Sequence, residues 1–206
     1  MALYTIGHST HPIADFIALL RRHAIEVVCD VRSSPYSRFN PQYNRENLIP
    51  ELKSVDVKYV FLGRELGPRS DRPSCYVNGK VSYRRLAKTE AFAEGLNRLR
   101  EGMRQYRVAL LCAEKDPMTC HRTILVCREM REEADILHIL EDGAIEHQAD
   151  LEKRLMRAHN LHQGEGKMTC LLSTDAAQKG TKVIIEARNG SAVRVTVPAA
   201  GFVVYH

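Results

Sequence analysis

A thiol, an imidazole and a guanidinium stand side by side at Cys120, His121 and Arg122. The hydrophobic pattern that follows predicts a helix, whose N-cap falls near Thr119 or Cys120. Free backbone N–H groups at a helix start stabilise a thiolate or an anion, and a neighbouring histidine and arginine lower a thiol pKa further. Cys120 is therefore a candidate nucleophile or redox thiol, and the alternative is that it packs as a small apolar residue.

Asp30 and Arg32 follow a predicted strand. Arg32 has the geometry to grip a phosphate or carboxylate through two parallel hydrogen bonds. Asp30 can act as a base, hold an arginine or orient His8. The alternative is an ion pair that only fixes the loops. We expect Arg32 to bind substrate and Asp30 to position it. We also expect Arg122 to bind substrate rather than to pair with Asp30 or Glu114.

The segment 33–44, with the sequence SSPYSRFNPQYN, is rich in hydroxyls, amides and rings. Tyr36, Phe39 and Tyr43 are interleaved with Arg38 and Arg45. Such a composition suits a nucleotide or nucleic acid, with bases stacked on the rings and phosphates on the arginines. The alternative is an ordered loop whose aromatic side chains anchor it to the body of the domain. The length and polarity of the segment favour recognition.

A second loop holds Gly63 and Gly67 together with Arg64 and Arg69. Glycines permit close approach of the backbone to a ligand, or a tight turn. The spacing matches no phosphate-loop or dinucleotide fingerprint. The stretch 64–80 contains two prolines and an Asn-Gly pair, and we interpret it as a mobile lid over the site.

Soft metal ligands are the next possibility. His8 follows a glycine at a strand end and is expected to point into the predicted crevice, with its role as acid, base or ligand left open. Cys112, Cys120 and His121 are the other candidates. Structural zinc sites usually contain Cys-x₂₋₄-Cys pairs, and this sequence has none. The sequence therefore assigns no metal ligand and no cofactor, and Cys112 is interpreted as buried.

Five short apolar runs predict the strands that position these residues. They are rich in β-branched residues and lack strict alternation, as strands covered on both faces do. The strands are expected at Leu3–Ile6, Glu26–Val31, Val57–Leu62, Val108–Cys112 and Asp135–Leu140. Helical patterns predict helices over Pro12–His23, Asn44 or Arg45 to Lys53, Ala87–Tyr106, Arg122–Glu132 and about His147–Asn160. Strands alternating with helices imply right-handed crossovers and a mostly parallel sheet.

In such sheets ligands bind beyond the carboxyl ends of the strands. The residues just after four of the predicted strands are polar. They are Gly7 to Thr10, Asp30 to Pro35, Gly63 to Gly67, and Cys112 to Arg122. We expect these four loops to converge at one edge of the sheet.

Composition limits the class of protein. The chain has 206 residues, 44% of them hydrophobic and 27% charged, which suits one domain with a real core, or a domain plus a small appendage. No secretory signal opens the chain, and no apolar run approaches the ~20 residues of a membrane helix. We therefore expect a cytoplasmic protein with free thiols and no membrane partner.

The net charge of +5 is unevenly spread. Residues 32–107 hold 16 Lys and Arg against 8 Asp and Glu, an excess of 8 positive charges that is larger than the excess of the whole chain. This bias fits either an anionic partner, such as a phosphate, a nucleotide or a nucleic acid, or a solvated basic face that binds nothing specific.

Four ordered segments carry a family resemblance: YTIGHST, DVRSSPYSRFNPQYN, YVFLGRELG and CAEKDPMTCHR. In this order they resemble the signature of family 488 among the domains of unknown function, over roughly residues 1 to 150. The resemblance implies an α/β domain and little about function, because that family is largely uncharacterised. The tail beyond about residue 163 lies outside it.

The predicted fold is α/β, with a mostly parallel sheet of about five strands flanked by helices in residues 1–162. Residues 163–206 are predicted to form a linker and a small β appendage. Asn189-Gly190 lies between two β-rich runs, 182–187 and 192–197, which is a hairpin signal. Residues 202–205 are a candidate third strand.

The predicted function is that of an enzyme acting on an anionic nucleotide, nucleic-acid or phosphorylated substrate. The alternatives are a nucleic-acid-binding module without catalysis and a thiol-based protein that handles a metal or an iron–sulfur cluster. The catalytic candidates are His8, Asp30, Glu114, Cys120 and His121. The substrate-binding candidates are Ser9, Arg32, Ser34, Tyr36, Arg38, Asn40, Arg64 and Arg122. The sequence leaves the oligomeric state open.

Overall fold

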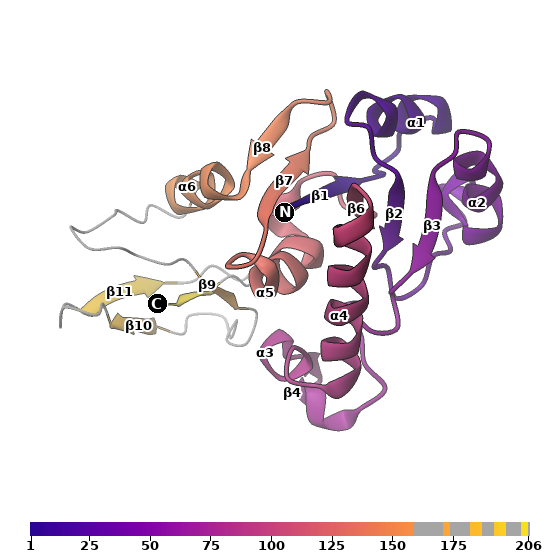
Figure 1. Cartoon of the computed structure of the whole chain (residues 1–206). Coiled ribbons are helices and arrows are strands. Elements are labelled where there is room, and N and C mark those ends of the chain that lie inside the picture. The colour runs from indigo at the N-terminus through magenta and orange to yellow at the C-terminus, as the bar shows by residue number, and fades with distance from the viewer. Residues whose placement is uncertain (159–170, 174–181, 187–191, 197–202, 206) are drawn as a thin grey trace.

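The computed structural model describes residues 1–158, 171–173, 182–186, 192–196 and 203–205. Its centre is a six-stranded sheet in the order β3-β2-β6-β1-β7-β8 (Figure 1). The strands are β1 (Ala2–Gly7), β2 (Val27–Asp30), β3 (Lys58–Phe61), β6 (Val108–Cys112), β7 (Asp135–Ile139) and β8 (Ile145–His147). All neighbours pair in parallel except β7 and β8. The five predicted strands and the mostly parallel sheet are confirmed, and β8 adds an antiparallel edge.

Helices cover both faces of the sheet. The helices α1 (Ile13–Arg22) and α2 (Arg45–Lys53) pack on one face. On the other face lie α4 (Glu90–Gln105) and a short helical stretch made of a π-helical segment, Arg122–Cys127, and α5 (Arg128–Met130). A further helix, α6 (Gln148–Ala158), follows β8.

Burial on both faces explains the lack of alternation in the strands. In β2, Val27 and Cys29 belong to the core beneath α4, whereas Val28 belongs to the core beneath α1 and α2. Each apolar side chain buried in this way contributes on the order of 1.5–3 kcal/mol to folding. The strands therefore pack against helices on both faces, which gives three layers: helices, sheet and helices.

Most helix boundaries agree with the sequence patterns. The predicted helix Arg122–Glu132 is instead π-helical over residues 122–127, the end predicted near Asn160 lies outside the described residues, and α4 starts later than predicted. Thr89 accepts a hydrogen bond from the backbone N–H of Phe92 at 3.2 Å, so α4 begins at Glu90 rather than at Ala87. A hydroxyl at the N-cap satisfies a backbone donor that the first turn leaves free.

The connections of the sheet change direction between β1 and β6, which are neighbours. The chain leaves β1 towards β2 with α1 on one face, and it leaves β6 towards β7 with α5 on the other face. Loops that diverge from adjacent parallel strands create a crevice beyond their carboxyl ends. The topology therefore predicts a site at the carboxyl ends of β1 and β6.

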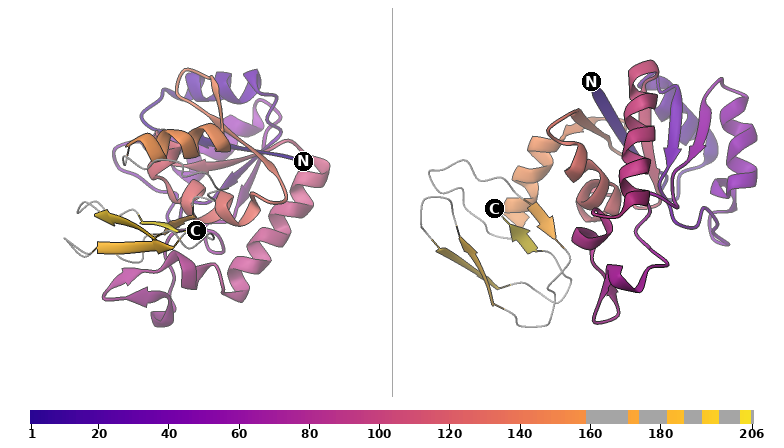
Figure 2. Two further views of the ribbon diagram at one scale, coloured as in Figure 1. Left: turned by 90° about the vertical axis from the view of Figure 1, so that its left-hand side faces the viewer. Right: turned by 60° about the horizontal axis from the view of Figure 1, so that its bottom comes forward.

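The stretch expected to form a lid carries a small hairpin. The strands β4 (Tyr76–Val77) and β5 (Lys80–Val81) pair across Asn78 and Gly79, whose φ angles are 50° and 74°. Two positive φ angles match a type I′ turn, which Asn-Gly favours. A short helix, α3 (Tyr83–Leu86), follows. In the right-hand view of Figure 2 this segment lies below α4, on the side towards which β1 runs from the N-terminus.

The tail contains two antiparallel strand pairs. The strands β10 (Lys182–Glu186) and β11 (Ala192–Thr196) pair as the sequence predicts, and β12 (Val203–Tyr205) pairs with β9 (Leu171–Ser173). The expected small β appendage is confirmed. The predicted linker 163–167 and the predicted turn 188–191 lie outside the described residues. Across the described residues, no helix combines the length and apolar character needed to span a membrane.

Candidate functional site

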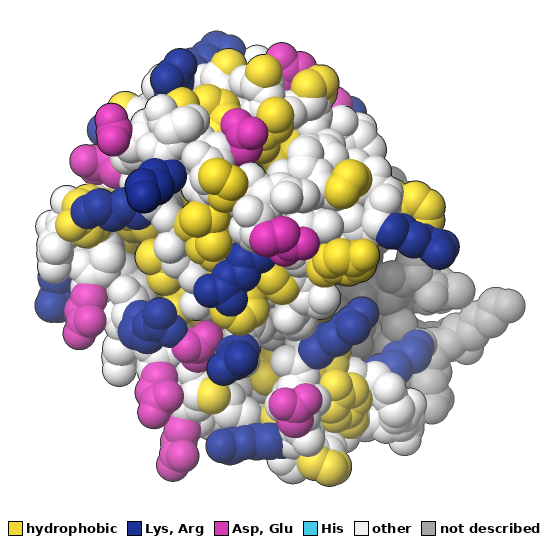
Figure 3. Space-filling model, turned by 90° about the vertical axis from the view of Figure 1, so that its right-hand side faces the viewer, with side chains coloured by type: hydrophobic (Ala, Val, Ile, Leu, Met, Phe, Trp, Pro, Cys, Tyr) yellow, Lys and Arg dark blue, Asp and Glu magenta, His cyan; other side chains and the backbone are white. Residues whose placement is uncertain are grey.

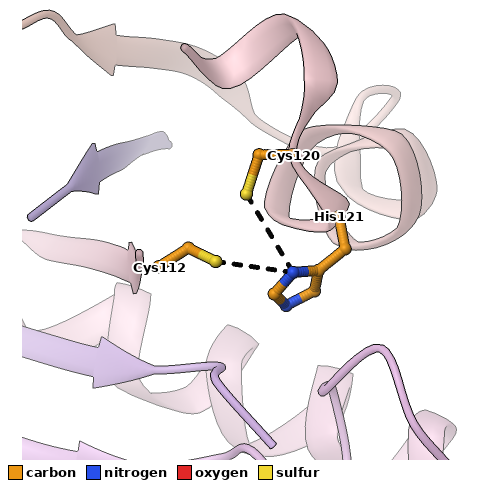
Figure 4. Close-up of side chains that lie close together, drawn as sticks. All are labelled: Cys112, Cys120 and His121. Carbon is orange, nitrogen blue, oxygen red and sulfur yellow. Dashed lines mark hydrogen bonds between the residues drawn. The ribbon is translucent and has the colours of Figure 1, made fainter. Parts of the chain in front are cut away.

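Two thiols and one imidazole converge beyond the end of β6 (Figure 4). The Sγ atoms of Cys112 and Cys120 lie 3.5 Å and 4.0 Å from Nδ1 of His121. All three side chains are buried, and their ligand atoms lie within 4.8 Å of one another. We call this group the Cys112–Cys120–His121 cluster.

The orientation of the imidazole is fixed from the other side of the ring. Nε2 of His121 lies 3.0 Å from the backbone oxygen of Val31. A carbonyl oxygen only accepts, so Nε2 must carry the hydrogen and donate it. In the neutral ring, Nδ1 then presents its lone pair to the two sulfur atoms.

Local structure brings the sulfurs together although eight positions separate the cysteines. Cys112 is the last residue of β6, and the chain returns through a 3₁₀ turn, Pro117–Thr119. Asp116 caps this turn by accepting from the N–H of Met118 at 2.8 Å. The carbonyl of Cys120 then accepts from the N–H groups of the next turn, so the helical stretch starts there.

An ion-pair network ties the same turn to α6. Arg154 donates to both oxygens of Asp116 at 2.8 Å and to both oxygens of Glu146 at 2.8 and 2.9 Å. The hydrogen bond from Arg154 lowers the pKa of Asp116. The loop that delivers Cys120 is thus held at Asp116 by a side chain from another element.

The two thiols have opposite pKa shifts. The hydrogen bond from Cys120, and the proximity of His121 and Arg122, lower the pKa of Cys112 despite its burial. Burial and the neighbouring Cys112 raise the pKa of Cys120. The two shifts have the direction that makes Cys112 ionise before Cys120.

Tyr83, at the start of α3, lies close enough to Cys120 and Cys112 to interact with them electrostatically. Burial raises the pKa of Tyr83 to about 12, and the proximity of Cys120 and Cys112 acts in the same direction. The hydroxyl stays protonated at neutral pH and remains available as a donor. The stretch 64–80, which the sequence predicts to be a lid, ends before Tyr83, and its movement over the site stays a prediction.

Arg122 is fully buried, and its donors go to two backbone carbonyls and one side-chain hydroxyl. Nη1 and Nη2 donate to the carbonyl oxygens of Glu114 and Lys115 at 2.6 and 3.3 Å, and Nε donates to Oγ1 of Thr5 at 3.3 Å. The guanidinium thus holds the loop after β6 while placing a positive charge near Cys112. Its predicted contact with substrate stays a prediction.

Gly7 shows how tightly this loop is packed against β1. A Cβ added at Gly7 would lie 1.8 Å from the carbonyl oxygen of Glu114 and 3.1 Å from Nη1 of Arg122. The backbone pairing of β1 and β6 also continues past the strands, because the N–H groups of His8 and Ser9 donate to the carbonyls of residues 112 and 113. A glycine is required here for space.

Asp30 and Arg32 form a buried, bidentate ion pair beyond β2. Nε and Nη2 of Arg32 donate to the two carboxylate oxygens of Asp30 at 2.9 and 2.6 Å. Asp30 also accepts from the hydroxyl of Tyr59 at 2.8 Å, and Nη2 of Arg32 donates to the carbonyl of Tyr43 at 2.9 Å. The ion pair fixes the neighbouring loops. This structural role is the alternative to substrate binding that the sequence left open. Substrate binding by Arg32 stays a prediction.

His8 joins this ion pair rather than the cysteines. Its Nδ1 donates to the carbonyl of Ser9 at 2.8 Å, and its Nε2 accepts from Nη1 of Arg32 at 3.2 Å. The ring stacks on Tyr43 with centroids 4.1 Å apart. Burial, with Arg32 second, lowers the pKa of His8 to about 4, so the ring is neutral at physiological pH.

The remaining predicted residues lie towards the surface. Ser34, Tyr36, Arg38, Arg64 and the Glu114 side chain are exposed, and Ser9 and Asn40 are half-buried. The structure therefore divides the predicted site into a buried group around the ends of β1, β2 and β6 and an exposed loop surface. The four loops meet, but their predicted site side chains are divided between these two groups.

Sequence reasoning expected Cys112 to be buried, as it is, and named it with Cys120 and His121 as a possible soft ligand, but assigned no metal site. It gave no role to Thr5, Tyr59 or Tyr83. The position of Cys112 at the end of a central strand, before the Cys120-His121 pair, was the available signal. The partners of the other residues depend on strand order, which the sequence does not reveal.

Comparison with known proteins completes the description. A model of the family described as "Domain of unknown function DUF488" matches residues 12–128. Searches of the curated proteins and of the solved structures returned no match. Three of the four motifs that carry the resemblance lie within the matched segment, which holds Asp30, Arg32 and the Cys112–Cys120–His121 cluster. Because the match covers more than half of the 206 residues, the chain belongs to the DUF488 family of domains of unknown function.

Proposed function

We propose that the protein is an enzyme with a thiolate-bound metal ion, held by the Cys112–Cys120–His121 cluster, and that it acts on an anionic substrate. The observation that carries the proposal is the convergence of two sulfurs on one Nδ1 whose ring is anchored by Val31. Zinc is the first candidate, because it accepts thiolate and imidazole ligands together.

The distance from Sγ of Cys112 to Nδ1 of His121 fits a tetrahedral ion, and the distance from Sγ of Cys120 is somewhat longer. Zn–S bonds of about 2.3 Å and Zn–N bonds of about 2.0–2.1 Å place the sulfur and nitrogen ligands roughly 3.6 Å apart. The two Sγ–Nδ1 distances are 3.5 and 4.0 Å. Ligating histidines usually donate their second ring N–H to a carbonyl or carboxylate, as His121 does to Val31.

A three-ligand protein site favours catalysis over a purely structural role. Within the described part of the chain, the group that could hold an ion contains three residues. Catalytic zinc sites combine three protein ligands with a fourth position for water or substrate. A bound zinc ion supplies a Lewis acid there, and the buried positive charge of Arg122 would favour an anion beside it.

The basic loop surface supports an anionic substrate. Arg38, Arg64 and Arg69 are exposed on the loops that follow β2 and β3. These side chains can attract and hold phosphate or carboxylate groups as the substrate enters. The neutral His8, the Asp30 carboxylate and the Tyr83 hydroxyl are the nearby groups that can orient substrate or move protons.

Metal analysis of variants tests the proposal. We expect about one zinc ion per chain after purification without chelator, and much less than this in Cys112→Ser and Cys120→Ser. Cys75→Ser is the matched control, because Cys75 is equally buried but lies in the core beneath α4. Equal metal content in all four proteins, or none in any of them after zinc addition, would contradict the proposal.

A second candidate is a metal-free thiol centre, and the opposite pKa shifts of the two cysteines favour it. A thiolate on Cys112 beside a thiol on Cys120 is the arrangement of a nucleophile with a proton donor, or of a redox pair. Alkylation with and without chelator separates the two candidates. Protection that chelator removes supports the metal, and rapid alkylation of Cys112 without chelator supports the free thiolate.

We further propose a cytoplasmic location. The cysteines of the described residues, at positions 29, 75, 112, 120 and 127, are all free. Free, buried thiols are typical of reducing compartments. Fractionation of the producing cells followed by immunoblotting tests this, and recovery in an oxidising compartment would contradict it.

A further inference from the structure

The loop after β2 carries two exposed rings to which the proposed function gives no role, beside arginines that it assigns to an anionic substrate. We propose that an aromatic–arginine surface, formed by Tyr36, Arg38, Phe39, Arg64 and Arg69, binds single-stranded nucleic acid by stacking bases on its rings. The inference goes beyond the proposed metal centre and does not depend on it.

The exposure of the two rings is the first observation. The exposed fractions are 66% for Tyr36 and 77% for Phe39, and Met1 is the other large hydrophobic residue exposed within the described part of the chain. Aromatic side chains usually bury most of their surface in a core or an interface. Two exposed rings three positions apart, on one loop, indicate a surface that a partner covers.

The loop is ordered although it is exposed. Oγ of Ser37 accepts from the N–H groups of Phe39 and Asn40 at 3.2 Å each. The side chain of Asn44 accepts from the N–H of Ser37 at 2.7 Å. Binding therefore requires little ordering of the loop, which keeps the entropic cost of association low.

Positive charge lies on the same loop as the rings and on the loop packed beside it. The guanidinium of Arg38 lies 4.7 Å from the centre of the Phe39 ring. The loop after β3 packs alongside, because the N–H of Arg69 donates to Oγ of Ser33 at 3.2 Å, and Arg64 and Arg69 are exposed on it. On the face that Figure 3 shows, Lys and Arg side chains lie beside exposed hydrophobic ones.

Exposed rings and arginines together indicate which kind of partner binds this surface. Arginines alone would suit any polyanion, and exposed rings alone would suit an apolar protein surface. Rings flanked by guanidinium groups match a chain of stackable bases joined by phosphates. Single strands are favoured over duplexes, because a duplex already stacks its bases and buries their faces.

A tryptophan reporter makes the test direct, because the chain contains no Trp. In Phe39→Trp, the single indole should show saturable quenching when unlabelled oligo-dT of about 12 nucleotides is added at low salt. Fluorescence anisotropy of labelled oligo-dT gives the affinity in parallel. A duplex of the same length is expected to bind at least about tenfold more weakly.

Matched substitutions separate stacking from charge. Phe39→Ala should weaken binding about tenfold with an unchanged melting temperature, since the ring is exposed. Arg38→Ala should lower the slope of log affinity against log salt by about 0.7. Arg21→Ala is the control: it removes an equally exposed charge at the end of α1, and it should change affinity less than twofold.

Three outcomes would overturn the inference. They are no anisotropy change with single-stranded DNA or RNA at low salt, binding that Phe39→Ala leaves intact, and equal affinity for the duplex. The last would leave only a nonspecific basic face. Cys112→Ser is expected to bind the oligonucleotide as the parent does, so failure of the metal proposal would not be mistaken for failure of this one.

Discussion

Replacing Arg32 with Met removes one half of a buried ion pair and leaves the other half in place. Asp30 keeps the hydrogen bonds from the Tyr59 hydroxyl at 2.8 Å and from the backbone N–H of residue 32 at 3.0 Å, but it loses the bidentate contact. Breaking one side of a buried pair costs about 3–5 kcal/mol. We therefore expect the free energy of unfolding to fall by about 4 kcal/mol, which lowers Tm by roughly 10 °C in a domain of this size.

Urea and thermal unfolding followed by circular dichroism measure this effect. The double variant Asp30→Asn/Arg32→Met should recover about half of the loss, because no uncompensated carboxylate remains. Arg32→Lys keeps the charge without the bidentate geometry and should lie between the parent and Arg32→Met. A Tm within about 2 °C of the parent for Arg32→Met would refute the reasoning and favour substrate binding as the main role of Arg32.

Three other predictions follow from the geometry. Gly7→Ala should destabilise the fold by about 3 kcal/mol or more in urea unfolding, whereas Gly102→Ala, whose added Cβ would meet its nearest neighbour at 3.8 Å, should not. Burial lowers the pKa of His138 to about 4, so stability that is full above about pH 6.5 should fall as the pH drops towards 4, and His138→Gln should flatten that slope. In metal-free protein, iodoacetamide should modify Cys112 before Cys120 at neutral pH, as read by mass spectrometry.

Much of the fold could be predicted because its strands are buried on both faces. Runs such as Val108–Cys112 carry no alternation, and the amphipathic stretches between them have the helical period. The hairpin at Asn78 and Gly79 was missed, although the dipeptide is a turn signal, because strands of two residues carry no periodicity. The π-helical segment after His121 has no sequence signature to find.

Part of the candidate site could be predicted because the sequence pattern shows where the strands end. Strand ends can be read from the sequence, so the loops with His8, Asp30 and Cys120 were correctly expected at one edge. The partner of each side chain cannot be read in this way. Arg122 could face a ligand or a carbonyl, and only the path of the loop after β6 shows that it holds the Glu114 carbonyl.

A cobalt titration tests the central claim most directly. Co²⁺ is added to the metal-free protein, and ligand-to-metal charge-transfer absorption reports thiolate ligands specifically. We expect one equivalent to saturate the signal, with the intensity reduced in Cys112→Ser and Cys120→Ser, unchanged in Cys75→Ser, and displaced by zinc. Absence of the charge-transfer band in the parent protein, or an unchanged band in Cys112→Ser, would contradict a metal site at Cys112, Cys120 and His121.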